Sequence, residues 1–164
     1  MSVQQMRSLL AQERFAGRAV SIEGTASTPL DDASVEANSA DFKDGPAVCA
    51  DASVHSLKHV IFSGFGTAAS PSEGVQVVLY DTAAANREAS ELFDKCSVAQ
   101  GYDFTSDTVK GSVRGADWAY LPGSLEVLYG NLHVTVIPQG GEAPQVSDAE
   151  ALADAVVRQV DANR

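Results

Sequence analysis

Apolar and polar residues alternate most regularly in two segments, 125–129 and 132–137, which flank the dipeptide Gly130-Asn131. This dipeptide favours a two-residue hairpin turn, because glycine adopts positive φ without a steric penalty. Pairing across the turn places six apolar residues on one face: Tyr129 opposite Leu132, Val127 opposite Val134, and Leu125 opposite Val136. The other face carries Leu128 with His133 and Glu126 with Thr135. We therefore predict an antiparallel hairpin with one buried face and one face at least partly exposed to water.

Other segments have the β-branched and aromatic content of strands. They cover residues 19–22, 58–65, 75–80, 102–113 and 117–121, the last two being separated at Gly115. The turn-rich residues 67–74 connect two of these segments. We therefore expect 58–65 and 75–80 to form a second hairpin with a longer loop.

Three segments carry apolar residues at helical spacing. Residues 3–13 follow Ser2, a good N-cap, and a longer helix is predicted from Asp81 or Thr82 to Cys96. In the second helix one face is apolar and ends at Cys96, so that this cysteine should point to the core and towards a partner on the underlying sheet. The C-terminal helix begins at a capping box, Ser147 to Glu150, and its apolar stripe suits packing on a sheet.

These elements predict one α+β domain over residues 1–164. We expect a twisted antiparallel sheet of about five to six strands, packed by an N-terminal, a middle and a C-terminal helix. Residues 23–48 contain few apolar anchors, so they are expected to form a long loop that is either mobile or functional. The sequence shows no internal repeat and no stretch long and apolar enough to cross a bilayer.

The net charge argues against nucleic acid as a partner. Eleven basic and 22 acidic residues give a formal charge of −11, and no basic cluster is present. A polyanion would be repelled, as would an anionic membrane surface. Solubility alone accounts for the charge, although a halophilic source or a cationic ligand would also fit it.

The two cysteines, Cys49 and Cys96, leave two alternatives open. If oxidised to each other they close a loop worth about 4 kcal/mol of unfolded-state entropy. If reduced, they are two buried thiols of a cytosolic protein. The first residues lack the features of a signal peptide. The chain is therefore either cytosolic or a segment whose export signal has been removed.

The sequence contains no nucleophile-elbow, phosphate-loop or H-E-x-x-H motif, and no cofactor is expected. His55 and His59 would align on a helix as metal ligands. Their neighbours are typical of a strand, however, and no Asp, Glu or Cys completes a set, so no metal is predicted. His133 is interpreted as a solvated residue on the exposed face of the hairpin.

Aromatic residues give one site hypothesis. Trp118 and Tyr120 lie two apart on a predicted strand, with Tyr102 or Phe104 on its neighbour. Such a row most often fills a core. The alternative is an apolar cleft for a small ligand or a peptide, lined by Tyr102, Phe104, Trp118 and Tyr120.

The order of elements resembles a known family. A cysteine precedes the first core strand. The strand ending in 77–80 leads into an Ala-rich helix over 82–96 that ends in cysteine. A hairpin over 130–136 then precedes a final Ala/Val-rich helix. Together these features, over residues 47–162, resemble the actinobacterial extracytoplasmic sensor-like domains. That family includes the extracellular domain of the mycobacterial receptor kinase PknH and related small lipoproteins.

The resemblance implies an exported α+β domain with a cleft for an unknown ligand and no catalytic activity. It also implies that Cys96 is a disulfide partner, here of Cys49, although the kinase-type domains have two disulfides and this chain has two cysteines. The implied partners are a small molecule or a cell-envelope protein, and a lipid anchor would lie upstream of this segment. The alternative is a secreted protein-protein interaction module that uses the 23–48 loop or a sheet edge.

Overall fold

The computed structural model describes residues 1–38, 45–69, 72–102, 107–121, 123–138 and 145–163. Its helices are α1 (Val3–Leu10), α2 (Asp32–Asn38), α3 (Ala47–His59), α4 (Ala83–Ala99) and α5 (Val146–Ala162). Its strands are β1 (Arg14–Phe15), β2 (Arg18–Ala19), β3 (Ile22–Ala26), β4 (Val60–Ala69), β5 (Ser72–Tyr80), β6 (Val109–Val113), β7 (Ala116–Leu121), β8 (Ser124–Tyr129) and β9 (Leu132–Pro138).

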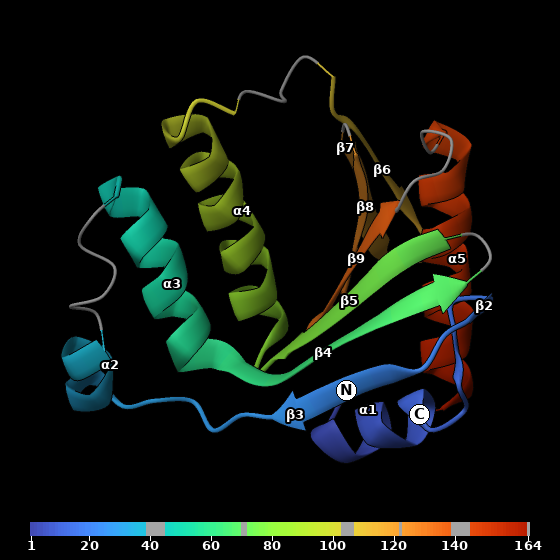
Figure 1. Ribbon diagram of the computed structural model, residues 1–164, viewed down its shortest axis with the longest axis horizontal. Coiled ribbons are helices and arrows are strands. Elements are labelled where there is room, and N and C mark those ends of the chain that lie inside the picture. The colour runs from blue at the N-terminus through green and yellow to red at the C-terminus, as the bar shows by residue number, and fades with distance from the viewer. Residues whose placement is uncertain (39–44, 70–71, 103–106, 122, 139–144, 164) are drawn as a thin grey trace.

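A seven-stranded antiparallel sheet forms the centre of the fold, in the order β3-β4-β5-β9-β8-β7-β6 (Figure 1). A separate two-stranded ribbon pairs β1 with β2. The α+β class with an N-terminal, a middle and a C-terminal helix is confirmed. The sheet has more strands than the five to six that the sequence predicted.

The β8–β9 hairpin confirms its predicted register. Leu125 pairs with Val136, Val127 with Val134 and Tyr129 with Leu132 across the turn at Gly130, whose φ is +58°. The face that carries these residues contributes to the main core, and α5 packs on it with six buried residues: Ala149, Leu152, Ala153, Val156, Val157 and Val160. Met6 and Leu9 of α1 and Phe15 of β1 belong to the same core.

The two edge strands are each covered by an aromatic ring at a glycine. Gly24 in β3 lies under the Phe62 ring of β4, and Gly111 in β6 lies under the Trp118 ring of β7. A side chain at either glycine would overlap the ring. The rings supply the apolar contact that the glycines lack, which holds these short edges in register.

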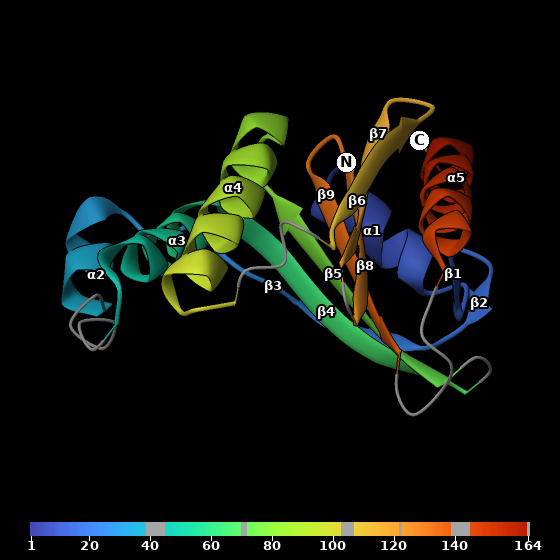
Figure 2. The same ribbon diagram turned by 90° about the horizontal axis from the view of Figure 1, so that it is seen from above.

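On the opposite face of the sheet, α4 packs at one end only, and α3 packs against α4. Figure 2 shows the sheet between this helix pair and α5. Most of the strand positions that face this side are polar or partly exposed, in agreement with the prediction that one sheet face is partly exposed to water. The helix pair and the uncovered part of this face position the site described below.

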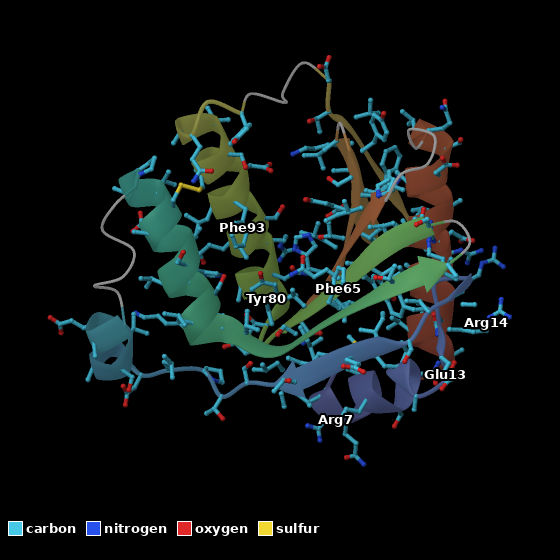
Figure 3. The ribbon with its side chains drawn as sticks, in the orientation of Figure 1. Arg7, Glu13, Arg14, Phe65, Tyr80 and Phe93 are labelled. Atoms are coloured by element: carbon cyan, nitrogen blue, oxygen red, sulfur yellow. A yellow bond between two sulfur atoms is a disulfide. The ribbon has the colours of Figure 1, made fainter. Side chains whose placement is uncertain are left out.

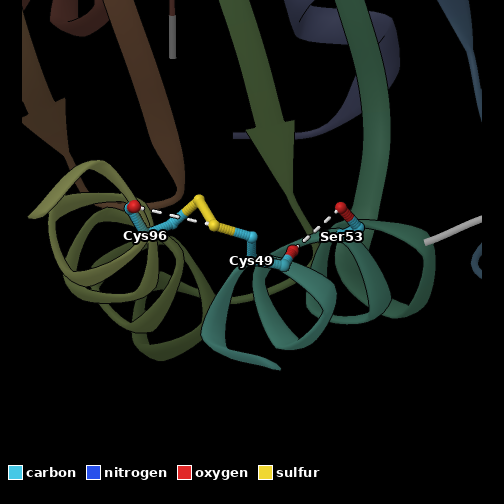
Figure 4. The surroundings of a disulfide bond; sticks show 3 residues. All are labelled: Cys49, Ser53 and Cys96. Atoms are coloured by element: carbon cyan, nitrogen blue, oxygen red, sulfur yellow. Dashed lines mark hydrogen bonds between the residues drawn. A yellow bond between two sulfur atoms is a disulfide. The ribbon is translucent and has the colours of Figure 1, made fainter. Parts of the chain in front are cut away.

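A disulfide joins α3 to α4 (Figure 4). Cys49 in the first turn of α3 is bonded to Cys96 near the end of α4, with a Cα–Cα distance of 4.7 Å. The expected bond between these cysteines is therefore present. The expectation that the partner of Cys96 would come from the sheet is wrong, because Cys49 lies on a helix that packs side by side with α4.

The prediction of a long loop over 23–48 is wrong for the residues that the structure describes there. β3 takes up Ile22–Ala26 and pairs with β4, and α2 spans Asp32–Asn38. The latter is joined to α3 by an ion pair between Asp32 Oδ1 and Lys58 Nζ, at 2.6 Å. Residues 39–44 lie outside the described residues.

Helix α3 was not predicted. Its sequence places only Ala52 and His55 in buried positions, so no apolar stripe marks it, and its last residues run into the β-branched segment of β4. The strand predicted to start at Lys58 therefore begins at Val60.

Two further boundaries differ from the predictions. β4 and β5 do pair as a hairpin, but they extend to Ala69 and from Ser72, so the loop is much shorter than the predicted 67–74. The last helix begins at Val146 with Gln145 as its N-cap, and the capping box pairs Gln145 with Asp148 instead of Ser147 with Glu150.

Candidate functional site

A cleft of about 800 Å³ separates the C-terminal half of α4 from the uncovered sheet face formed by β6, β7 and β8. Figure 1 shows α4 and these strands diverging from a common base. The described residues that line the cleft come from α4, from the segment that follows it and from the three strands: Ser90, Asp94, Ser97, Val98, Tyr102, Thr108, Lys110, Gly111, Ser112, Asp117, Trp118, Ala119, Leu121, Glu126 and Leu128.

Asn86 fixes the base of α4 on the sheet. This residue is fully buried, and its Nδ2 donates to the carbonyl oxygens of Gly130 and Leu132, each at 3.0 Å. The helix starts just before it, where the Thr82 side chain accepts a hydrogen bond from the amide of Ala85. The first turns of α4 are therefore held on the β8–β9 turn, while its later turns leave the sheet and open the cleft.

The α4 wall is polar at its centre. Ser90, Asp94 and Ser97 recur at helical spacing on the cleft side, and Val98 adds an apolar group that is 50% exposed. The other side of α4 packs on α3 and is fixed there by the disulfide. Because α3 occupies that side, the polar row can face only the cleft.

Strand register builds the floor of the cleft. Lys110, Ala119 and Glu126 form one row across β6, β7 and β8, because Lys110 pairs with Ala119 and Ala119 with Glu126. The neighbouring row is Ser112, Asp117 and Leu128. Neighbouring strands lie about 4.8 Å apart, so the small Ala119 leaves a gap between the two long charged side chains on either side.

An ion pair spans the cleft between its two walls. Lys110 Nζ of β6 lies 3.1 Å from Asp94 Oδ2 of α4. Both side chains are well exposed, at 63% and 48%. An exposed pair of this kind contributes at most about 1 kcal/mol, so it can open at little cost when a ligand enters.

Glu126 is the most enclosed carboxylate of the floor. Its side chain is 22% exposed, and its Oε2 lies 3.7 Å from Nε2 of His133, which is 11% exposed. This separation is too long for a hydrogen bond, and the His133 nitrogen is buried without a partner in the described part of the chain. The interpretation of His133 as a solvated surface residue is therefore wrong.

Tyr80 lies where β5 meets the base of α4 and is buried there with Ala85 and Ala89 (Figure 3). Burial raises the pKa of its phenol to about 12, and the negative charge of Glu126 adds to this shift, while a hydrogen bond with Ser56 opposes it. Figure 3 also shows Phe93 of α4 and Phe65 of β4 near the space between the helix and the sheet. These two rings are 44% and 51% exposed.

The four aromatic residues predicted to line a cleft have different positions. Tyr102 lines the cleft and is 58% exposed, whereas Phe104 lies outside the described residues. Trp118 is among the lining residues, but its ring covers Gly111 and belongs to the core on the α5 side. Its Nε1 is buried and has no hydrogen-bond partner among the described residues. Tyr120 packs against the same core.

His55 and His59 do lie on one helix, contrary to the strand expected for this segment. Their ring centroids are 4.5 Å apart. Each is engaged elsewhere, however: His55 Nε2 lies 2.8 Å from the carbonyl oxygen of Ala85, and His59 Nδ1 lies 3.0 Å from Asp81 Oδ2. Within the described residues no group of three or more His, Cys, Asp or Glu side chains could hold a metal ion.

Sequence reasoning missed the polar residues of the cleft. Asp94 and Lys110 were not singled out, and Glu126 was placed on the partly exposed face of the hairpin without a role. The usable signal was the alternation of apolar and polar residues along β7 and β8. It places Glu126 and Asp117 together on the sheet face opposite the apolar one. The position of α4 over that side could not be inferred from periodicity.

Comparisons with protein families, with curated proteins and with solved structures find no match to this chain. Among the described residues, no helix is both long and apolar enough to cross a membrane.

Proposed function

We propose that this chain is an extracytoplasmic ligand-binding or sensor-like domain without catalytic activity, which holds a small molecule between α4 and the sheet. The cleft carries the proposal. Its volume of about 800 Å³ is within the range of small-molecule sites, which are commonly about 300–1,000 Å³. Its lining combines apolar side chains, such as Leu121 and Leu128, with a few charged ones.

The disulfide supports the extracytoplasmic part of the proposal. Bonds between cysteines persist in oxidising compartments and are rare in the cytosol. Here the Cys49–Cys96 bond also supports the cleft wall, because it ties the free end of α4 to α3. The resemblance to actinobacterial sensor-like domains leads to the same expectation, including an export signal and a lipid anchor encoded upstream. The 5′ end of the gene tests that part directly.

A fragment screen tests ligand binding. Saturation-transfer NMR would be run with one fragment library on the wild type and on Ala119→Phe, whose larger side chain would fill the gap in the cleft floor. Ala151→Phe, at an exposed position of α5, is the matched control. We expect fragments that bind the wild type and the control but not Ala119→Phe. Equal binding to all three proteins would contradict the proposal.

A second candidate function, a protein-protein interaction module, is favoured by one observation. Phe65 and Ile137 are both on the face that β4 and β9 expose beyond the cleft, at 51% and 43% exposure. Large exposed apolar side chains are typical of interaction surfaces. A stoichiometric partner that is lost with Phe65→Asp but kept with Ala119→Phe would favour this function over the first.

A further inference from the structure

The charges of the cleft floor restrict what it can bind. Three carboxylates, Asp94, Asp117 and Glu126, and one cation, Lys110, line the cleft among the described residues. Lys110 is paired with Asp94. No described cation pairs with Asp117 or with Glu126, apart from the neighbouring His133 when it is protonated. The floor therefore carries an excess of negative charge.

Register brings the two remaining carboxylates close together. Asp117 pairs with Leu128, and Glu126 pairs with Ala119, so Asp117 and Glu126 are diagonal neighbours on adjacent strands. Diagonal neighbours of an antiparallel pair are about 7–8 Å apart at the backbone, within reach of side chains of this length. One ammonium group between them could contact both carboxylates.

A second observation concerns unused hydrogen-bonding capacity beside this position. The Nε2 of His133 is buried and has no hydrogen-bond partner among the described residues, and it lies 3.7 Å from Glu126 Oε2. A buried polar atom without a partner costs free energy, which is recovered if a bound ligand shifts Glu126 so that its carboxylate accepts a hydrogen bond from Nε2–H of His133. His133 pairs with Leu128 but does not line the cleft, so a ligand would act on it through Glu126.

Part of the cleft is apolar. Leu121 and Leu128 on the floor and Val98 on the α4 wall surround the space next to the carboxylates, and Tyr102 lies at its exposed side. Such a surface favours a hydrophobic body of moderate size. The net charge of −11 over the whole chain adds a long-range attraction for cations.

We propose that the cleft selects an organic cation: an ammonium group held between Asp117 and Glu126, carrying an apolar body that packs on Leu121 and Leu128. This inference rests on the proposed function, since it names the ligand class of the same cleft. Anionic ligands of the same shape are excluded, because they would place a negative charge beside two carboxylates.

Three probes of matched shape and different charge test the inference: phenethylamine, phenethyl alcohol and hydrocinnamate. Dissociation constants come from amide NMR shifts of cleft residues such as Ser90 and Leu128. We expect phenethylamine to bind at least about tenfold more tightly than the alcohol, a difference of about 1.4 kcal/mol. Hydrocinnamate should bind more weakly than both.

Two variants locate the selectivity. Glu126→Gln should weaken phenethylamine binding about tenfold, because it removes a partly desolvated charge pair. Asp117→Asn, at an exposed carboxylate, should weaken it about two- to fivefold. Both variants should leave the affinity for the alcohol unchanged. Asp117 is exposed, so its variant should fold even if Glu126→Gln does not. Glu150→Gln, on exposed α5 surface, removes the same charge outside the cleft and should change nothing.

The outcomes separate the two proposals. If the alcohol binds in the cleft as tightly as the amine, or if the two variants leave the amine affinity unchanged, the cation proposal is overturned while ligand binding stands. If none of the three probes shifts any cleft amide, both proposals are overturned. Amine binding that depends on Asp117 and Glu126 supports both.

Discussion

Asn86 of α4 donates two hydrogen bonds, each of 3.0 Å, to the carbonyl oxygens of Gly130 and Leu132 at the β8–β9 turn. One buried amide thus connects the helix that forms one wall of the cleft to the hairpin that forms its floor. The angle at which α4 leaves the sheet depends on this contact and on the disulfide at the other end of the helix pair.

We expect Asn86→Ala to lower the free energy of unfolding by about 2 kcal/mol, because the buried carbonyl of Leu132 and the partly buried carbonyl of Gly130 lose their donor. Chemical denaturation followed by circular dichroism measures the change. Lys95→Ala, at an exposed position of the same helix, should stay within about 0.5 kcal/mol of the wild type. Similar losses in both variants would mean that the Asn86 bonds do not anchor the helix.

Removing the disulfide should have a large effect. The bond closes a loop with a sequence separation of 47 residues, for which loop entropy predicts a stabilisation of about 4 kcal/mol. In chemical denaturation, the free energy of unfolding of the double variant Cys49→Ala/Cys96→Ala should be lower than that of the wild type by this amount or somewhat less. Reductant should destabilise the wild type and leave the double variant unaffected. An equal response of both proteins to reductant would contradict the role of the bond.

Tyr80 should ionise at high pH, with a pKa of about 12. Because the folded-state pKa is raised above the ordinary value of 10.0, the fold favours the neutral phenol. The resulting stability, about 2–3 kcal/mol, is fully present below pH 10 and is lost as pH rises towards 12. Phenolate absorbance measures the ionisation, and Tyr80→Phe should remove the transition near pH 12. A spectrum in which this variant loses a transition near pH 10 would refute the assignment.

Gly111→Ala should destabilise the β6 edge by about 1–3 kcal/mol, since the added Cβ overlaps the Trp118 ring. Gly45→Ala is the control, because no atom lies within 4 Å of the corresponding Cβ and the backbone there is not left-handed. Thermal unfolding compares the two. If Gly45→Ala lowers the melting temperature more than Gly111→Ala does, the Trp118 ring does not stabilise the β6 edge.

Local sequence signals predicted those helices and strands whose characteristic pattern lies within a short stretch of the chain. Gly130-Asn131 with its flanking alternation specified the β8–β9 hairpin and its register, and Thr82 marked the start of α4. Helix α3 was missed because it buries only Ala52 and His55, so that its pattern is too weak to distinguish from the adjoining strand.

The cleft could be predicted only in part. Alternation placed Glu126 on the less apolar face of the hairpin, but its proximity to Asp117 depends on the β7–β8 register, and the space above it depends on the tilt of α4. That tilt results from the Asn86 contacts and from a disulfide to a helix that the sequence did not reveal. The hypothesis of an aromatic cleft was incomplete because the ring of Trp118 lies on the α5 side of β7, in the core, and the sequence did not reveal on which side of the sheet each helix packs.

A crystallographic fragment screen on the oxidised wild-type protein tests most directly whether the space between α4 and the sheet is a ligand site. We expect bound fragments to gather in the cleft, in contact with Ser97, Leu128 and Glu126, and amines to be the more frequent among them. Fragments bound repeatedly at other surfaces, with the cleft empty in every data set, would contradict it.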